Sequence, residues 1–153
     1  MAATPSDSAI AELSVGRHRV RIEPPLFLVE NHGPVTLAEF DQLMTHIQRA
    51  IVERGVRYFL MNVADTPPPS PEVRERMRQQ ERVVGLRATV GFGAPPALVL
   101  FSWVIRRGME LLTRGKLPRF VMLRDEAAAR AWVSADLAAH PLSAGGRGDS
   151  QDD

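Results

Sequence analysis

The chain has 153 residues, of which 44% are hydrophobic and 24% are charged, a composition typical of a folded domain. Its 19 basic and 18 acidic residues leave a formal net charge of +1, so the basic excess on which nucleic-acid binding depends is absent. The chain contains no cysteine, which excludes disulfides, thiolate zinc sites and cysteine nucleophiles. Residues 1–8 lack the basic and apolar regions of a signal peptide, so we expect a cytoplasmic protein.

The two ends of the chain differ in composition from its middle. Residues 1–13 mix Ser, Pro, Ala and acidic residues, which indicates a flexible leader. Residues 141–153 are rich in Gly and Asp, which is typical of a disordered tail. One folded domain is therefore predicted over residues 14–140.

The first predicted elements are two short strands. In His18–Ile22, apolar and arginine side chains alternate, which indicates a strand with one face in water. Leu26–Glu30 is a continuous apolar run that follows Pro24 and Pro25. Two strands about so short a connection predict an antiparallel pair.

A long amphipathic helix follows the strands. Thr36 and Glu39 have the spacing of a capping box, in which each side chain bonds to the backbone of the other residue. Apolar residues then recur at steps of three and four and predict one buried stripe: Leu37, Phe40, Met44, Ile47 and Ile51. The helix is predicted to end at Arg54, before Gly55.

The remaining elements alternate between strand and helix. Strands are predicted at Arg57–Val63, Ala88–Phe92 and Arg119–Leu123, and helices at Pro71–Val84 and Pro96–Leu112. Asp125 is predicted to cap a last helix that buries Ala128 and Trp132 and also involves Val133 and Leu137. The order β-β-α-β-α-β-α-β-α predicts an α/β domain with a mixed, mostly parallel sheet.

The predicted helix Pro96–Leu112 is apolar on nearly all sides. A helix that lies on one face of a sheet buries only one stripe, so we expect some of Leu100, Trp103 and Val104 to face a partner, a second copy of the chain or a ligand. The alternative is that this helix is buried throughout. The apolar run is too short for a membrane span and is interrupted by Pro95 and Pro96.

The order of elements resembles that of the STAS domain, found in anti-sigma-factor antagonists and in the tails of sulfate transporters. The segments that carry the resemblance are Val104–Leu112 and Leu117–Trp132, where a strand that ends in Arg-Asp-Glu leads into an alanine-rich helix closed by Trp. The resemblance extends over about residues 16–138. It implies a STAS-like fold, a regulatory role without enzymatic activity, and a protein partner of the kinase or anti-sigma type.

In that family a serine in the loop before the second helix caps the helix and is phosphorylated by a partner kinase. The corresponding segment here runs from Asn62 to Glu72, and Ser70 stands in the matching place. Pro71 follows it, and the glycine of the family is absent. We therefore interpret Ser70 as a helix cap, with phosphoacceptor as the alternative that the resemblance implies.

The sequence thus favours a non-enzymatic interaction module that binds a protein partner or itself. The residues predicted to contact the partner are Asp65, Thr66, Ser70, Glu72, Arg74, Leu100, Trp103 and Val104. Neither a cofactor nor a metal is expected, because the histidines have no ligand spacing. The alternative function is a carrier of a lipid or small apolar ligand, as in the related CRAL-TRIO domains, with a cavity lined by Phe92, Phe101 and Trp103.

Overall fold

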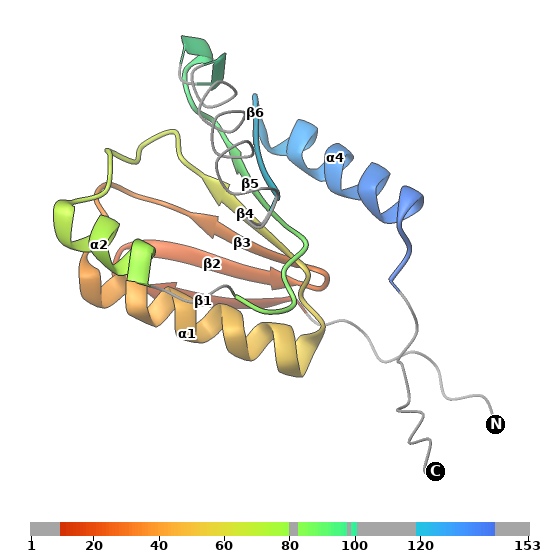
Figure 1. Ribbon diagram of the computed structural model, residues 1–153, viewed down its shortest axis with the longest axis horizontal. Coiled ribbons are helices and arrows are strands. Elements are labelled where there is room, and N and C mark those ends of the chain that lie inside the picture. Colours follow the sequence, from red (N-terminus) through yellow and green to blue (C-terminus); the bar gives the residue numbers. More distant parts are fainter. Residues whose placement is uncertain (1–9, 80–82, 98, 101–118, 143–153) are drawn as a thin grey trace.

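The computed structural model describes residues 10–79, 83–97, 99–100 and 119–142. Its centre is a six-stranded sheet in the order β1-β2-β3-β4-β5-β6 (Figure 1). The strands are β1 (Ala11–Val15), β2 (His18–Glu23), β3 (Leu26–Glu30), β4 (Tyr58–Asn62), β5 (Ala88–Phe92) and β6 (Arg119–Leu123). The helices with described bounds are α1 (Leu37–Arg54), α2 (Pro71–Gln79) and α4 (Glu126–Ala139).

The sheet has an antiparallel part and a parallel part. β1, β2 and β3 pair antiparallel, whereas β3, β4, β5 and β6 pair parallel. Parallel neighbours need a crossover connection, and α1 and α2 lie in two of these connections, after β3 and after β4. The prediction of a mixed, mostly parallel α/β sheet is confirmed.

The structure adds one strand to the predicted order. β1, Ala11–Val15, pairs with β2 along its whole length, so placing residues 11–13 in a flexible leader was wrong. Ala11, Leu13 and Val15 alternate with two exposed polar residues, which is the pattern of a strand with one wet face. The segment is short, and it became a strand because β2 lies beside it. Residues 1–9 and 143–153, where the remaining leader and the tail are predicted, lie outside the described residues.

Helix α1 has both of its predicted ends. Thr36 and Glu39 form the capping box, and Gly55 ends the helix in the left-handed region at φ 71°. The buried stripe consists of Phe40, Leu43, Ile47, Ala50 and Ile51. It is rotated slightly from the prediction, because Leu43 is buried where Met44 was expected and Leu37 is exposed.

Two other predicted helices differ from the structure in detail. α2 ends at Gln79, and Val83 and Val84 are not helical, so the prediction of a helix to Val84 was too long. Asp125 caps α4 as predicted, through a bond from the backbone of Ala128. The buried positions of α4 are Ala129, Val133 and Asp136, while Trp132 and Leu137 are half-buried.

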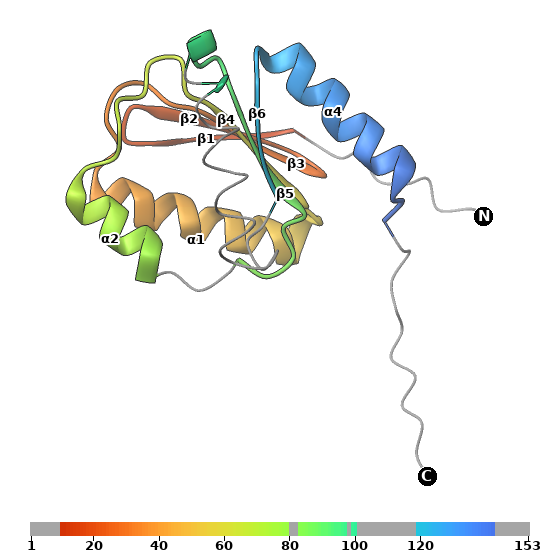
Figure 2. The ribbon, with the colours of Figure 1, turned by 45° about the horizontal axis from the view of Figure 1, so that its top comes forward.

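The two faces of the sheet carry separate cores, and α1 and α2 lie on the opposite side of the sheet from α4 (Figure 2). On the α1 face the buried side chains include Phe27, Val29 and Ile47, and Phe59 packs against them. On the α4 face they include Leu28, Leu60, Val90 and Val133. Within the strands, Leu28 and Val90 are fully buried, and Phe59, Met61 and Val121 are half-buried.

Candidate functional site

The loop between β4 and α2 lies at the carboxyl ends of the parallel strands. It is held there by backbone hydrogen bonds: the N–H of Val63 donates to the carbonyl of Phe92 at 2.9 Å, and the N–H of Gly33 donates to the carbonyl of Asp65 at 3.0 Å. The loop is therefore attached on one side to the last residue of β5 and on the other side to the segment that follows β3. This attachment places Asp65 and the start of α2 at a defined position on the edge of the sheet.

Ser70 occupies the N-cap position of α2. Its hydroxyl oxygen accepts the backbone N–H of Val73 at 3.3 Å, and its carbonyl accepts the N–H of Arg74 at 2.9 Å. Pro71 is the first helical residue, where its missing N–H leaves no helix bond unmade. The hydrogen bond from Val73 to the Ser70 hydroxyl confirms the interpretation of Ser70 as a helix cap. The side chain is also exposed.

Almost all of α2 faces water. Val73 is its buried residue, at 2% exposure, and every other residue of the helix is exposed. Met77 is 52% exposed. Ser70, Arg74 and Met77 are spaced by four and then three residues, so they follow one face of the helix. We call the exposed side chains Asp65, Ser70, Glu72, Arg74 and Met77 the α2 surface.

The charged residues of α2 form one ion pair within the helix and one with α1. Arg78 pairs with Glu75, and Arg76 binds Asp41 of α1, with 2.8 Å between Nε and Oδ1. Within the part of the chain that the structure describes, Glu72 and Arg74 form no ion pair. Both charges of the α2 surface are therefore available to another molecule.

Two buried oxygen atoms near the loop have no hydrogen-bond partner among the described residues. They are Oγ1 of Thr66 and Oδ1 of Asn31. Asn31 is 5% exposed and follows β3 directly. Thr66 was predicted to contact a partner; the residue is half-buried and its hydroxyl oxygen is buried, so that hydroxyl does not belong to the exposed surface.

The second predicted contact region is only partly described. Pro96, Ala97, Val99 and Leu100 are helical, and Leu100 is 73% exposed. They follow the carboxyl end of β5 and so lie at the same edge of the sheet as the α2 surface. Trp103 and Val104, with the remainder of the predicted helix, lie outside the described residues.

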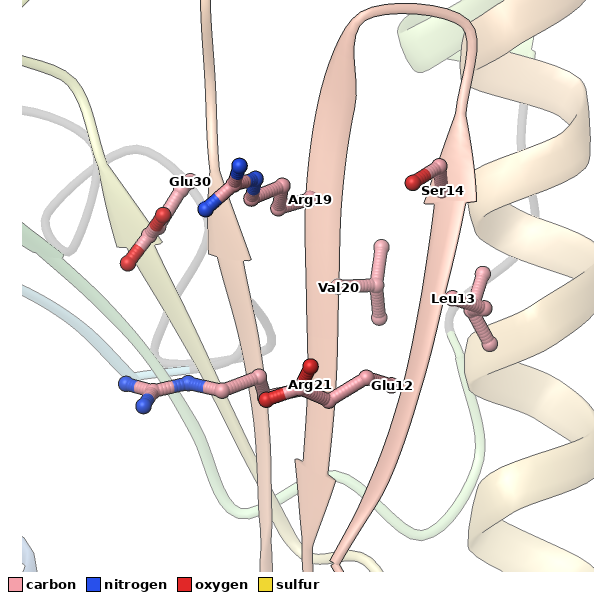
Figure 3. A pocket seen from close by; sticks show the side chains of 7 residues that line it. All are labelled: Glu12, Leu13, Ser14, Arg19, Val20, Arg21 and Glu30. Carbon is pink, nitrogen blue, oxygen red and sulfur yellow. The ribbon is translucent and has the colours of Figure 1, made fainter.

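The open face of the antiparallel strands carries a depression of about 440 Å³. Figure 3 shows Glu12 and Ser14 from β1, Arg19 and Arg21 from β2, and Glu30 from β3 around it, with Leu13 turned toward α1. A charged wet face is common in antiparallel sheets. The depression does not have the apolar lining that the carrier hypothesis requires, and two of the three residues named for such a cavity, Phe101 and Trp103, are not described.

A buried polar cluster fastens α4 to the sheet. The hydroxyl of Tyr58 donates to Asp136 at 2.6 Å, and Arg119 donates to the other carboxylate oxygen at 2.8 Å. These hydrogen bonds, from Tyr58 first, lower the pKa of Asp136, whereas burial raises the pKa of Tyr58. Arg87 donates to the Tyr58 hydroxyl at 3.1 Å. Sequence reasoning missed this cluster, because its members are far apart in the chain.

Two further features were sought in the described residues, a metal site and a membrane span. No group of three or more His, Asp or Glu side chains among them could hold a metal ion. None of the helices in the described ranges is long and apolar enough to cross a membrane.

The comparisons with known proteins found solved structures that are similar to this chain. No protein-family model matches the chain, and no curated protein matches its sequence. The chain is similar to a solved protein of the DUF3478 family with a SpoIIAA-like fold from Shewanella loihica PV-4, at 14% identity and a TM-score of 0.48, over 86% of this chain and 98% of that chain.

The chain is also similar to the anti-sigma factor antagonist SpoIIAA in its unphosphorylated form. The identity is 19% and the TM-score 0.44, over 82% of this chain and 98% of that chain. Both solved structures are less than 20% identical to this chain. A fold hosts many functions, so the function has to be argued from the surface of this chain.

Proposed function

We propose that this chain is a non-enzymatic interaction module that docks a protein partner on the α2 surface. The observation that carries the proposal is the exposure of α2, which buries only Val73. A helix as short as α2 is barely stable by itself. With one buried side chain, it also contributes little to the hydrophobic core. Its exposed face is free to serve another purpose.

The chemistry of that face supports a protein partner. Met and Arg are enriched in protein interfaces, and a flexible thioether adapts to the shape of a partner. Arg74 has no ion pair within the described residues, so an acidic side chain on the partner would gain a new pair with it. Met77 would contribute buried apolar area at about 25 cal/mol per Å².

Reversal of charge on the α2 surface tests the proposal. The tagged chain is used to capture proteins from its native cell, and a captured protein is then purified and its Kd measured. Arg74→Glu and Met77→Asp should each weaken binding by about tenfold or more, as truncations at interface centres do. Arg49→Glu is the matched control, since Arg49 lies exposed on the neighbouring helix α1, and it should leave the Kd unchanged. Equal binding by all three variants would contradict the proposal.

Ser70 has a structural part in this proposal. Its hydroxyl already accepts a helix N–H, so we assign it the role of a cap that sets the start of α2. Phosphate on Ser70 in cells, with partner binding reversed by Ser70→Asp, would instead establish it as a phosphoacceptor for a partner kinase.

Self-association is the second candidate, and the exposure of Leu100 favours it. An apolar side chain that is 73% exposed gains from being covered by a second copy. Leu100→Glu should then convert a dimer into a monomer in light scattering while the fold persists. A wild-type chain that is monomeric at high concentration would remove this candidate.

A further inference from the structure

A histidine is buried where the antiparallel and parallel parts of the sheet meet α1. His18 begins β2 and has no exposed surface. Its Nδ1 accepts the backbone N–H of His32 at 3.1 Å, and its Nε2 lies 3.3 Å from Oε2 of Glu39. A backbone N–H can only donate, so Nδ1 carries no proton and the ring proton must be on Nε2, facing the carboxylate. The two hydrogen bonds therefore determine the tautomer of a neutral ring.

The segment that forms a hydrogen bond with the His18 ring also forms a hydrogen bond with the loop that precedes α2. His32 donates to the ring, and the next residue, Gly33, donates its N–H to the carbonyl of Asp65. Gly33 has φ 79°, in the left-handed region that favours glycine. The backbone N–H groups of two consecutive residues, His32 and Gly33, therefore link Nδ1 of the buried His18 ring to the carbonyl of Asp65.

A second proton on the ring would disrupt this connection. Protonated Nδ1 becomes a donor that faces the donor N–H of His32, so that hydrogen bond is lost and the His32 peptide has to rotate. The carboxylate of Glu39, which comes from α1, can accept the proton of Nε2 in either state of the ring. Because the contact with Glu39 anchors the ring through Nε2, we expect the His32–Gly33 backbone to move when Nδ1 gains a proton.

The other charged groups near this segment have a smaller part. The Arg17 guanidinium of the β1–β2 turn lies beside Gly33, where a Cβ would come within 3.3 Å of its Nη1, and it opposes a second positive charge there. The His32 side chain is exposed, so water screens it. Arg19 and Glu30 line the depression on the open face of the sheet.

We propose that His18 is a proton-sensitive positioning residue for the α2 surface. The neutral ring holds His32 and Gly33 in place, and with them the hydrogen bond from Gly33 to Asp65, whereas protonation releases this attachment of the loop and leaves the bond from Val63 to Phe92. The consequence for docking rests on the proposed function: partner binding weakens at acid pH because the loop beside α2 loses this attachment.

The first experiment uses the free chain and needs no partner. NMR follows the ring nitrogens of His18 and the amide exchange of His32 and Gly33 from about pH 8 to about pH 5, the range in which histidines titrate. With the intrinsic pH dependence of exchange removed, exchange at Gly33 should accelerate by about tenfold, a typical coupling between two sites. Its midpoint should coincide with the titration of His18. Exchange at Gly33 that stays constant while His18 titrates would overturn the inference.

Two variants separate His18 from its neighbour. In His18→Asn the side-chain oxygen can still accept the His32 N–H but cannot be protonated, so the transition at Gly33 should vanish. The matched control, His32→Asn, removes the nearby exposed imidazole and keeps the backbone N–H, so the transition should persist. The opposite pattern would also overturn the inference. If His18→Asn does not fold, the wild-type titration decides alone.

A final measurement distinguishes this inference from the proposed function. The Kd of a purified partner is measured across the same pH range with the wild type and His32→Asn. A partner that binds on the α2 surface with a Kd independent of pH would refute regulation by His18 and leave the proposed function intact. If Arg74→Glu and Met77→Asp leave every captured partner bound, the proposed function fails, and the response of Gly33 in the free chain still tests the proton-sensitive connection.

Discussion

Helices α1 and α2 lie side by side on the same face of the sheet, and they differ in how the protein uses them (Figures 1 and 2). α1 buries five side chains, has a capping box at its start and ends at a left-handed glycine. α2 buries Val73 alone and is held to α1 by the bond from Arg76 to Asp41. The comparison teaches that α1 stabilises the domain, whereas α2 presents a surface. Each of the following predictions tests this difference.

The largest effect is expected in the buried stripe of α1. Ile47 is fully buried, and Ile47→Ala should lower the free energy of unfolding by about 3 kcal/mol, because it removes apolar contacts and leaves a cavity. Met77→Ala on α2 is the counterpart and should change it by less than about 0.5 kcal/mol. Urea unfolding measures both. Similar losses in the two helices would show that α2 also belongs to the core.

The caps of the two helices give the next comparison. Thr36→Ala removes one half of the capping box of α1 and should cost about 1.5 kcal/mol, and Ser70→Ala should cost about 1 kcal/mol through the lost bond to Val73. Since α1 is part of the core, Thr36→Ala should lower the midpoint of global unfolding. Hydrogen exchange should show the effect of Ser70→Ala mainly as faster exchange within α2. Uniformly faster exchange in Ser70→Ala would contradict this separation.

The acid sensitivity of the start of α1 provides a pH test. The hydrogen bond from the backbone of Thr36, followed by the bonds from the Thr36 and His18 side chains, lowers the pKa of Glu39 although burial opposes it. A carboxyl group with a lowered folded-state pKa stabilises the fold above its unfolded-state pKa, and this contribution is lost as the pH falls through the folded-state value. Glu39→Gln should cost about 1 kcal/mol at neutral pH.

Below that folded-state pKa, the difference between Glu39→Gln and the wild type should shrink. The curve of unfolding free energy against pH measures this change. Glu72→Gln on α2 is the control, and its curve should follow that of the wild type, since Glu72 forms no ion pair with the described residues. A constant difference between Glu39→Gln and wild type down to strong acid would mean that the carboxylate charge has no part.

The smallest effect on stability is expected on the exposed face of α2. Arg74→Glu should change the free energy of unfolding by less than about 0.5 kcal/mol, because the side chain is exposed and has no ion pair in the described part of the chain. Thermal unfolding of the purified variant checks this. A marked loss of stability would mean that any loss of binding in Arg74→Glu reflects unfolding.

Much of the fold could be predicted because the relevant signals are local. The capping box of Thr36 and Glu39, the left-handed Gly55 and the Asp125 cap each involve residues within one turn of a helix, and all three are present. The cap at Ser70 was found in the same way. β1 was missed although its alternation is visible, because five residues near the end of a chain become a strand only when another strand pairs with them.

The candidate site was predicted less completely. Ser70, Glu72 and Arg74 are exposed at the carboxyl edge of the sheet, as expected, whereas the hydroxyl oxygen of Thr66 is buried. The 52% exposure of Met77 was not predicted, because nothing in the sequence distinguishes this residue from a buried apolar residue of a helix.

The amino-acid sequence by itself determined the order of the described elements from β2 onward, both ends of α1, the caps that begin α2 and α4, and the mixed character of the sheet, because periodicity and capping act over a few residues. The tertiary structure alone decided which polar groups meet. Tyr58 and Asp136 are 78 residues apart, and His18 reaches Glu39 over 21 residues. Asp136 looks like an ordinary helix residue and His18 like an ordinary strand residue until the layers pack. Their partners are determined by how strands and helices are placed in space, and no local pattern encodes that placement.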